Sequence, residues 1–211
     1  MVLVFTAVLL LAASEPPCSL SASEERIANQ IGFEKEILLL VKGEARSPVH
    51  RLSGFDEEGY QIMANGVTVS VPSSRSEQVL RSLREKLRPL KHMAFTIEIN
   101  NALKIDKIGI IKGTDQYDIL QVMHTNGDEQ DVSHEEVIEK LKGWGKRCAF
   151  EIIGAENDWV EIEFRSMPRD LKVFAGEIYD FSPDTVDEDA GSLSELIKEI
   201  NTTKRLMLWW N

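Results

Sequence analysis

Apolar residues three and four positions apart predict amphipathic helices in five segments of the chain. Four of these segments begin with a Ser-x-x-Glu capping box, in which the serine side chain accepts the third amide and the glutamate reaches back to the serine amide. The boxes pair Ser21 with Glu24, Ser74 with Glu77, Ser133 with Glu136 and Ser192 with Glu195. The fifth helix is predicted to begin at Pro168, a favoured first helical residue, and to end near Ser182.

Between these helices the apolar period changes to two, which is typical of strands. Asn65-Gly66 is the dipeptide that a type I′ turn requires, and it predicts a hairpin between residues 60–64 and 67–71. Further strands are predicted at 93–99, 108–112, 117–123, 148–153, 159–164 and 205–210, whereas 37–41 fits either a strand or a helix. The order of elements predicts an α+β fold, with about four to five helices packed on a largely antiparallel sheet.

The first residues have the features of a secretory signal peptide. Residues 2–13 are almost wholly apolar, no charge precedes Glu15, and Ala12 and Ser14 form a small-x-small cleavage pattern. Twelve apolar residues in a helix span about 18 Å, less than the ~30 Å hydrocarbon core, which disfavours stable membrane insertion. We therefore expect a signal peptide at 1–14, a flexible tail at 15–23 and a single α+β domain over 24–211. The protein would then be extracytoplasmic, periplasmic or secreted; a wrongly assigned start codon or a hydrophobic first strand would leave it cytoplasmic.

The charge is unevenly distributed along the chain. The net charge is −11, and residues 106–211 carry 23 acidic and 12 basic side chains, which accounts for the whole excess. An acidic surface repels a phosphate backbone, because nonspecific nucleic-acid affinity comes from Lys and Arg. We therefore expect no nucleic-acid partner.

The two cysteines, Cys18 and Cys148, allow at most one intramolecular disulfide. Cys18 lies in the expected tail, and Cys148 begins an apolar run. Cys148 is therefore expected to pack as a small hydrophobe and Cys18 to stay free, although the spacing leaves pairing open.

Two polar stretches could carry chemistry. Asp118 and His124 lie in one that continues to His134, but no His-Glu-x-x-His or Cys-x-x-Cys spacing supports a metal site, and a turn at 125–127 followed by a solvated loop explains it. The other begins at Asp184 and includes Asp187. Counted from Asp187, Gly191 falls at position 5 and Lys198 at position 12, which excludes an EF-hand. These residues could instead precede a helix N-terminus or form a functional carboxylate pair, and we expect no cofactor or metal.

Basic residues gather on the predicted helix over 76–91. They are Arg75, Arg81, Arg84, Lys86, Arg88 and Lys91, against only Glu77 and Glu85. This stripe could bind an acidic partner or phosphates, lie against the acidic half of the same chain, or be solvated.

Several segments in the second half resemble a known family. They are Ile110-Ile111-Lys112-Gly113-Thr114-Asp115-Gln116-Tyr117-Asp118-Ile119-Leu120, Thr125-Asn126-Gly127, Pro183-Asp184-Thr185-Val186-Asp187 and Leu208-Trp209-Trp210. In this order they resemble the bacterial domain-of-unknown-function family 4253, over about residues 90–211. The resemblance implies a compact domain that ends on a Trp-Trp strand and implies no particular activity. This chain has Ser182, Glu188 and Asn211 where Cys, Gln and Asp are common in the family, so roles of those side chains do not carry over.

The terminal tryptophans suggest a contact surface. On a strand Trp209 and Trp210 point to opposite faces, so at most one can lie fully in a one-sided core, and a helix could cover the other. With Asp184 and Asp187 they form the candidate binding surface of a non-enzymatic protein-interaction module, which includes the immunity type that neutralises a basic toxin. The alternative hypothesis is a metal-assisted hydrolase that uses Asp118, His124, Asp184 and Asp187, although no known nucleophile or phosphate-loop signature is present.

Overall fold

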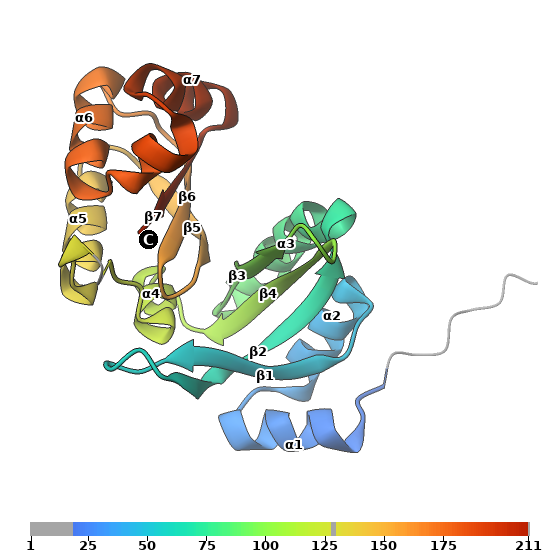
Figure 1. Ribbon diagram of the computed structural model, residues 1–211. Coiled ribbons are helices and arrows are strands. Elements are labelled where there is room, and N and C mark those ends of the chain that lie inside the picture. The colour runs from blue at the N-terminus through green and yellow to red at the C-terminus, as the bar shows by residue number, and fades with distance from the viewer. Residues whose placement is uncertain (1–18, 128–129, 211) are drawn as a thin grey trace, which may run out of the picture.

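The computed structural model describes residues 19–127 and 130–210 (Figure 1). The predicted signal peptide and Cys18 lie outside these residues. The elements in chain order are α1 (Ala22–Ile31), α2 (Lys35–Ala45), β1 (Val49–Phe55), β2 (Gln61–Pro72), α3 (Ser73–Leu87), the 3-10 turn η1 (Arg88–Leu90), β3 (His92–Asn100), β4 (Ile105–Lys112), α4 (Tyr117–Met123), α5 (His134–Gly145), β5 (Phe150–Ala155), β6 (Trp159–Phe164), α6 (Leu171–Phe181), the π-helix η3 (Thr185–Ala190), α7 (Leu193–Thr203) and β7 (Arg205–Trp209). Within these ranges no helix has both the length and the apolar character needed to cross a bilayer.

One seven-stranded sheet runs through the molecule in the order β1-β2-β4-β3-β5-β6-β7. All neighbouring strands are antiparallel except β3 and β5, which pair in parallel through Thr96 and Gly154 alone. The predicted α+β class and largely antiparallel sheet are thus confirmed. The predicted number of helices is too low, because the described residues contain seven α-helices.

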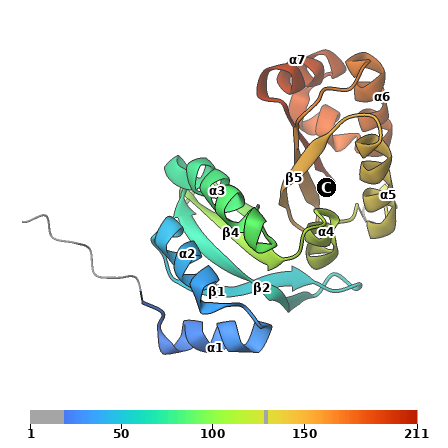
Figure 2. The ribbon, with the colours of Figure 1, turned by 180° about the vertical axis from the view of Figure 1, so that it is seen from behind.

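Two apolar cores lie on opposite faces of the first four strands. Figure 2 shows α2 and α3 in front of these strands, where Leu38 and Leu83 pack with Val69 and Ile110. The other face belongs to a core that continues through α4 and α5 into the second half of the chain. The cores confirm the prediction of period-two strands, since β2 and β4 each bury alternate side chains on the helical face.

The predicted strand at 117–123 is wrong, because these residues form helix α4. A short apolar run is compatible with either a helix or a strand, and here the turn that precedes the run starts a helix. The Asp115 side chain accepts from the amide of Tyr117 at 3.1 Å, and the turn places Ile119, Leu120 and Met123 on the buried side. The ambiguous segment 37–41 is also helical, as part of α2.

The predicted hairpin at Asn65-Gly66 is also wrong. Both residues lie within the continuous strand β2, and the hairpin turn instead precedes that strand, between β1 and β2. The register with β1 shifts from Arg51–Val67 to Ser53–Met63, so Asn65-Gly66 occupies a β-bulge. Gly66 is needed there because a Cβ atom would lie 2.7 Å from both the Ile110 carbonyl oxygen and Leu52 Cδ2.

The capping predictions are confirmed in part. Ser21 and Ser133 form complete capping boxes, and Ser192 accepts the amide of Glu195. Helix α3 begins at Ser73, behind Pro72, so the predicted box at Ser74 is wrong. Helix α6 begins three residues after Pro168 because Asp170 caps it, accepting from two amides at 3.1 Å.

Candidate functional site

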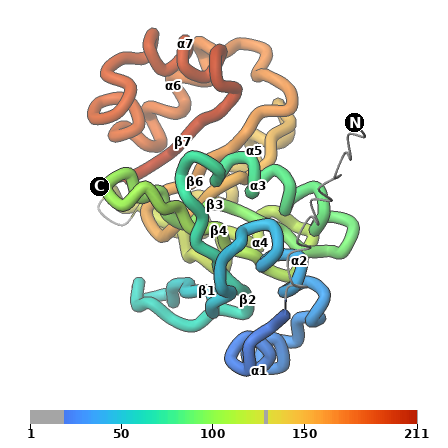
Figure 3. Tube along the Cα trace, turned by 90° about the vertical axis from the view of Figure 1, so that its right-hand side faces the viewer, coloured from blue at the N-terminus to red at the C-terminus, as the bar shows by residue number. Residues whose placement is uncertain are grey.

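The predicted surface residues Asp184 and Asp187 lie at the π-helix η3, which Figures 1 and 3 place with α6 and α7 at the end of the molecule away from α1. Gln130 donates a hydrogen bond to Asp184 through Nε2. The Tyr179 hydroxyl on α6 donates to Asp187 Oδ2 at 3.3 Å. Both aspartates therefore also connect η3 to neighbouring segments.

The two terminal tryptophans have different environments. Trp210 is 3% exposed, its ring meets Phe181 edge-on with 5.7 Å between centroids, and its Nε1 donates to the Phe181 carbonyl at 3.3 Å. Trp209 is half-buried, and its main chain is bound by the hydroxyls of Ser182 at 2.8 Å and Thr185 at 3.3 Å. Of the pair, a partner could therefore contact the side chain of Trp209 but not that of Trp210.

An acidic surface lies on η3 and the end of α6. We define the acidic face as the exposed side chains of Asp180, Asp187, Glu188 and Asp189, from the end of α6 and from η3. Within the described ranges none of the four forms an ion pair with Lys or Arg. The negative charge of Asp187 raises the pKa of the Tyr179 hydroxyl. Tyr179 is 39% exposed and Leu193, at the start of α7, is 40% exposed, so apolar surface accompanies the carboxylates.

The predicted polar residues His124 and Asp118 serve different local structures. His124 adopts a left-handed conformation at the end of α4 and stacks on His134, with ring centroids 4.5 Å apart. Burial raises the pKa of Asp118, and the charge of Asp115 adds to this effect. In the described part of the chain, no three His, Cys, Asp or Glu side chains are grouped so that they could hold a metal ion.

Three of the four segments that carry the family resemblance, 125–127, 183–187 and 208–210, meet around the end of β7. A Cβ atom on Gly127 would lie 2.6 Å from Trp210 Cδ1, so only glycine permits this close contact. Thr125 donates to the carbonyl of Glu156 at 2.6 Å, and Asn126 donates to that of His124 at 3.0 Å. These motifs thus build the core that supports the C-terminal strand.

A comparison with family models covers the same part of the chain. Residues 107–211 match the family model Domain of unknown function (DUF4253). The predicted resemblance is therefore confirmed for the C-terminal part of the chain. No curated protein and no solved structure matches the chain.

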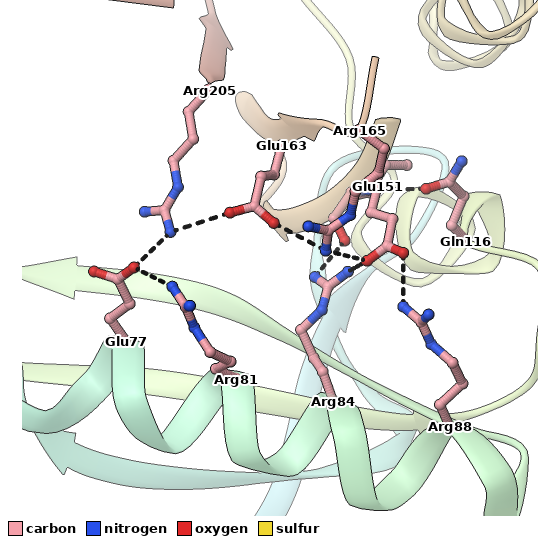
Figure 4. Close-up of polar contacts among 10 residues, drawn as sticks. Glu77, Arg81, Arg84, Arg88, Gln116, Glu151, Glu163, Arg165 and Arg205 are labelled. Carbon is pink, nitrogen blue, oxygen red and sulfur yellow. Dashed lines mark hydrogen bonds and ion pairs between the residues drawn. The ribbon is translucent and has the colours of Figure 1, made fainter. Parts of the chain in front are cut away.

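Where the N-terminal half meets the DUF4253 part, three guanidinium groups converge on one carboxylate (Figure 4). Glu151 on β5 pairs with Arg84 at 2.6 Å, Arg88 at 2.7 Å and Arg165 at 2.9 Å. Burial acts to raise the pKa of Glu151, but the hydrogen bonds from Arg165, Arg88 and Arg84 outweigh it and lower the pKa to about 2. The carboxylate is therefore charged throughout the neutral range.

A second set of ion pairs continues this network toward β7. Arg205 contacts Glu77 of α3 at 2.9 Å and Glu163 of β6 at 3.7 Å, and Glu77 also pairs with Arg81 at 3.1 Å. We call the whole arrangement the junction network, and it consists of Glu77, Arg81, Arg84, Arg88, Glu151, Glu163, Arg165 and Arg205. It connects α3 to three strands of the DUF4253 part.

Beside this network lies a cleft of about 380 Å³ between β3, β5 and the segment that leads into α4. Strands β3 and β5 pair only through Thr96 and Gly154, so β5 has no neighbouring strand beside the cleft. Side chains form the hydrogen bonds of the β5 backbone there instead. The amide of Ile152 donates to Gln116 Oε1 at 2.8 Å, and its carbonyl accepts from Arg84 at 2.9 Å. We call this the junction cleft.

The junction cleft could not be found from sequence, because its residues are far apart in the chain. The basic stripe on α3 was the available signal, and the structure selects one of its alternatives for Arg84 and Arg88, which lie against Glu151 of the acidic half. Gln116 and Glu151 gave no sequence signal, since nothing local distinguishes them from solvated polar residues.

Cys148 is buried as predicted, and burial raises its thiol pKa.

Proposed function

We propose that this protein is a non-enzymatic protein-interaction module that binds a basic partner protein through the acidic face. The observation that carries the proposal is the state of Asp180, Asp187, Glu188 and Asp189, which are exposed and form no ion pair with Lys or Arg within the described residues. Elsewhere in the DUF4253 part, Glu151, Glu163 and Glu177 are paired with arginines. Carboxylates without an internal ion pair are free to pair with a partner's Lys and Arg side chains.

Apolar surface beside the carboxylates supports the same proposal. Interfaces combine a core enriched in Tyr and Trp with a polar rim, and Tyr179 and Leu193 supply partly exposed apolar side chains next to the acidic face. Charge complementarity raises association rates and excludes acidic competitors. A basic toxin, neutralised as by an immunity protein, is one partner with this chemistry.

The test compares two variants with the same loss of negative charge. The first replaces the acidic face by Asp180→Asn, Asp187→Asn, Glu188→Gln and Asp189→Asn. The control replaces Glu36, Glu57, Glu58 and Glu85 by Gln, which are exposed residues of the N-terminal half. A partner is first captured from native lysate with the wild-type chain and purified, and its Kd is then measured with each protein.

We expect the acidic-face variant to weaken binding about 10-fold or more and the control to change it little, because close charge pairs contribute more than distant ones. Wild-type binding should also weaken as salt rises, since the Debye length falls from about 10 Å at 0.1 M to about 3 Å at 1 M. Equal effects of the two variants, or binding that ignores salt, would contradict the proposal.

A further inference from the structure

Two arginines line the junction cleft together with two carboxylates, those of Asp115 and Glu151. Arg84 and Arg88 both line it, four residues apart on the same side of α3 and η1. They and Arg165 share the single carboxylate of Glu151, although Arg165 is also held by Glu163 at 3.0 Å. Three guanidiniums thus share two carboxylates, and within the described residues Arg88 has no carboxylate partner besides Glu151.

Arg88 is the group best placed to receive an anion. Its side chain is 67% exposed, and within the described residues its only hydrogen bond runs from Nη2 to Glu151 Oε1. A guanidinium has five donors in a planar fork that matches a carboxylate or phosphate in two-point contact. The remaining donors of Arg88 can therefore bind an anion without breaking the ion pair.

The rest of the cleft is largely apolar. Met93, Ile119, Phe150 and Ile152 line its walls, and its volume of about 380 Å³ lies at the small end of ligand pockets, which measure about 300–1,000 Å³. Thr114 and Tyr117 also line the cleft. Burial raises the pKa of Tyr117, so its hydroxyl remains a donor at neutral pH.

Besides Glu151, a second acidic side chain lines the cleft, and it accepts a hydrogen bond from a nearby backbone amide. Asp115 Oδ1 accepts from the amide of Tyr117 at 3.1 Å, as part of the turn before α4. The two arginines of the cleft come from α3 and η1.

We propose that the junction cleft binds a small organic anion, with its carboxylate or phosphate group on Arg88 and Arg84 and an apolar body against Met93, Ile119 and Phe150. The site is separate from the acidic face, so this inference and the proposed protein partner stand independently. The ligand contacts both the N-terminal half and the DUF4253 part.

Three probes test the two elements of this ligand. Phenyl phosphate has both an anion and an apolar ring, inorganic phosphate has the anion alone, and benzyl alcohol has the ring with an uncharged polar group. Each is titrated into the full chain while the amide resonances of Gly113 and Thr114 are followed by NMR. We expect saturable shifts with phenyl phosphate, at an affinity at least about 10-fold tighter than with either other probe, because binding uses a charged hydrogen bond and apolar burial together.

Variants locate the site. Arg88→Gln should weaken phenyl phosphate binding about 10-fold or more, whereas the control Arg81→Gln should leave it unchanged. Arg81 lies on the same helix, 74% exposed and paired with Glu77, and it does not line the cleft. Thr114→Trp should abolish binding by filling the cleft from an exposed position. Circular dichroism and thermal melting verify that each variant is folded.

Three results would overturn the inference. The first is the absence of saturable shifts at Gly113 and Thr114 with phenyl phosphate. The second is equal affinity for phenyl phosphate and either single-feature probe. The third is equal weakening by Arg88→Gln and Arg81→Gln, which would indicate nonspecific attraction to the basic stripe.

Discussion

The junction network and the acidic face contain similar acidic side chains in opposite situations. At the junction, Glu151 is held by three arginines, and its pKa falls to about 2. At the acidic face, Asp187, Glu188 and Asp189 face solvent without a basic partner among the described residues. The first arrangement contributes to stability, whereas the second leaves charge available for another molecule. Substitution should therefore affect unfolding at one site and binding at the other.

The largest expected effect is that of Glu151→Ala. It should lower the free energy of unfolding by about 3 kcal/mol, because removing the central carboxylate leaves three guanidiniums facing one another in a partly buried site. Urea unfolding at pH 7 measures the change, with Glu188→Ala as the control, for which we expect a change within about 0.5 kcal/mol. If the two variants lost equal stability, the contrast between junction and face would be wrong.

The same contrast has a pH signature. The pKa of Glu151 is lower in the folded chain than the usual value near 4.3, so its contribution is complete above that pH and is lost as the pH falls toward about 2. The acid-induced loss of stability should therefore be smaller for Glu151→Ala than for the wild-type chain.

The next largest effect concerns the core that supports the acidic face. Gly127→Ala should destabilise the protein by about 2 kcal/mol, because its Cβ would overlap the buried Trp210 ring. Gly143→Ala is the matched control, since no atom lies within 4 Å of its added Cβ and alanine gains up to about 1 kcal/mol within a helix. Thermal unfolding of both variants measures the difference, and a neutral Gly127→Ala would show that Trp210 can move aside.

The smallest expected effect comes from His134, at the start of α5. Burial lowers its pKa, and although the Thr125 carbonyl opposes this shift, the neighbouring His124 adds to it. Its contribution to stability is therefore complete above about pH 6.5 and is lost as the pH falls below that value. His134→Phe keeps the ring stack without the titrating group, so its stability should fall less than that of the wild-type chain from pH 7 to 5.5. Parallel pH slopes would contradict this assignment.

Sequence prediction succeeded where an element depends on residues close to it in the chain, and failed where it depends on distant ones. The capping boxes of Ser21 and Ser133 depend on residues three positions away, and both formed as predicted. Asn65-Gly66 has the local preference of a turn, but it lies where the register of β2 with β1 shifts while Gly66 pairs with β4, which makes it a bulge. Segment 117–123 has too few residues for its period to decide between helix and strand.

The candidate sites show the same limit. Ser182 and Thr185 bind the backbone of Trp209 and so attach the last strand to the segment that contains Asp184 and Asp187, which the order of the family motifs suggested but did not determine. Glu151 meets arginines 63 and 67 residues earlier in the chain, and no local pattern predicts such a pairing.

The single parallel pair between Thr96 and Gly154 has a mechanical consequence. Within each half, ladders of backbone hydrogen bonds resist separation, and dissolved salt has little influence on such bonds. Between the two halves, ion pairs and the shared apolar core provide most of the resistance to separation. The attraction between partly exposed charges becomes weaker as the salt concentration rises. The molecule should therefore bend more easily between its two halves as the salt concentration rises, while each half stays stiff.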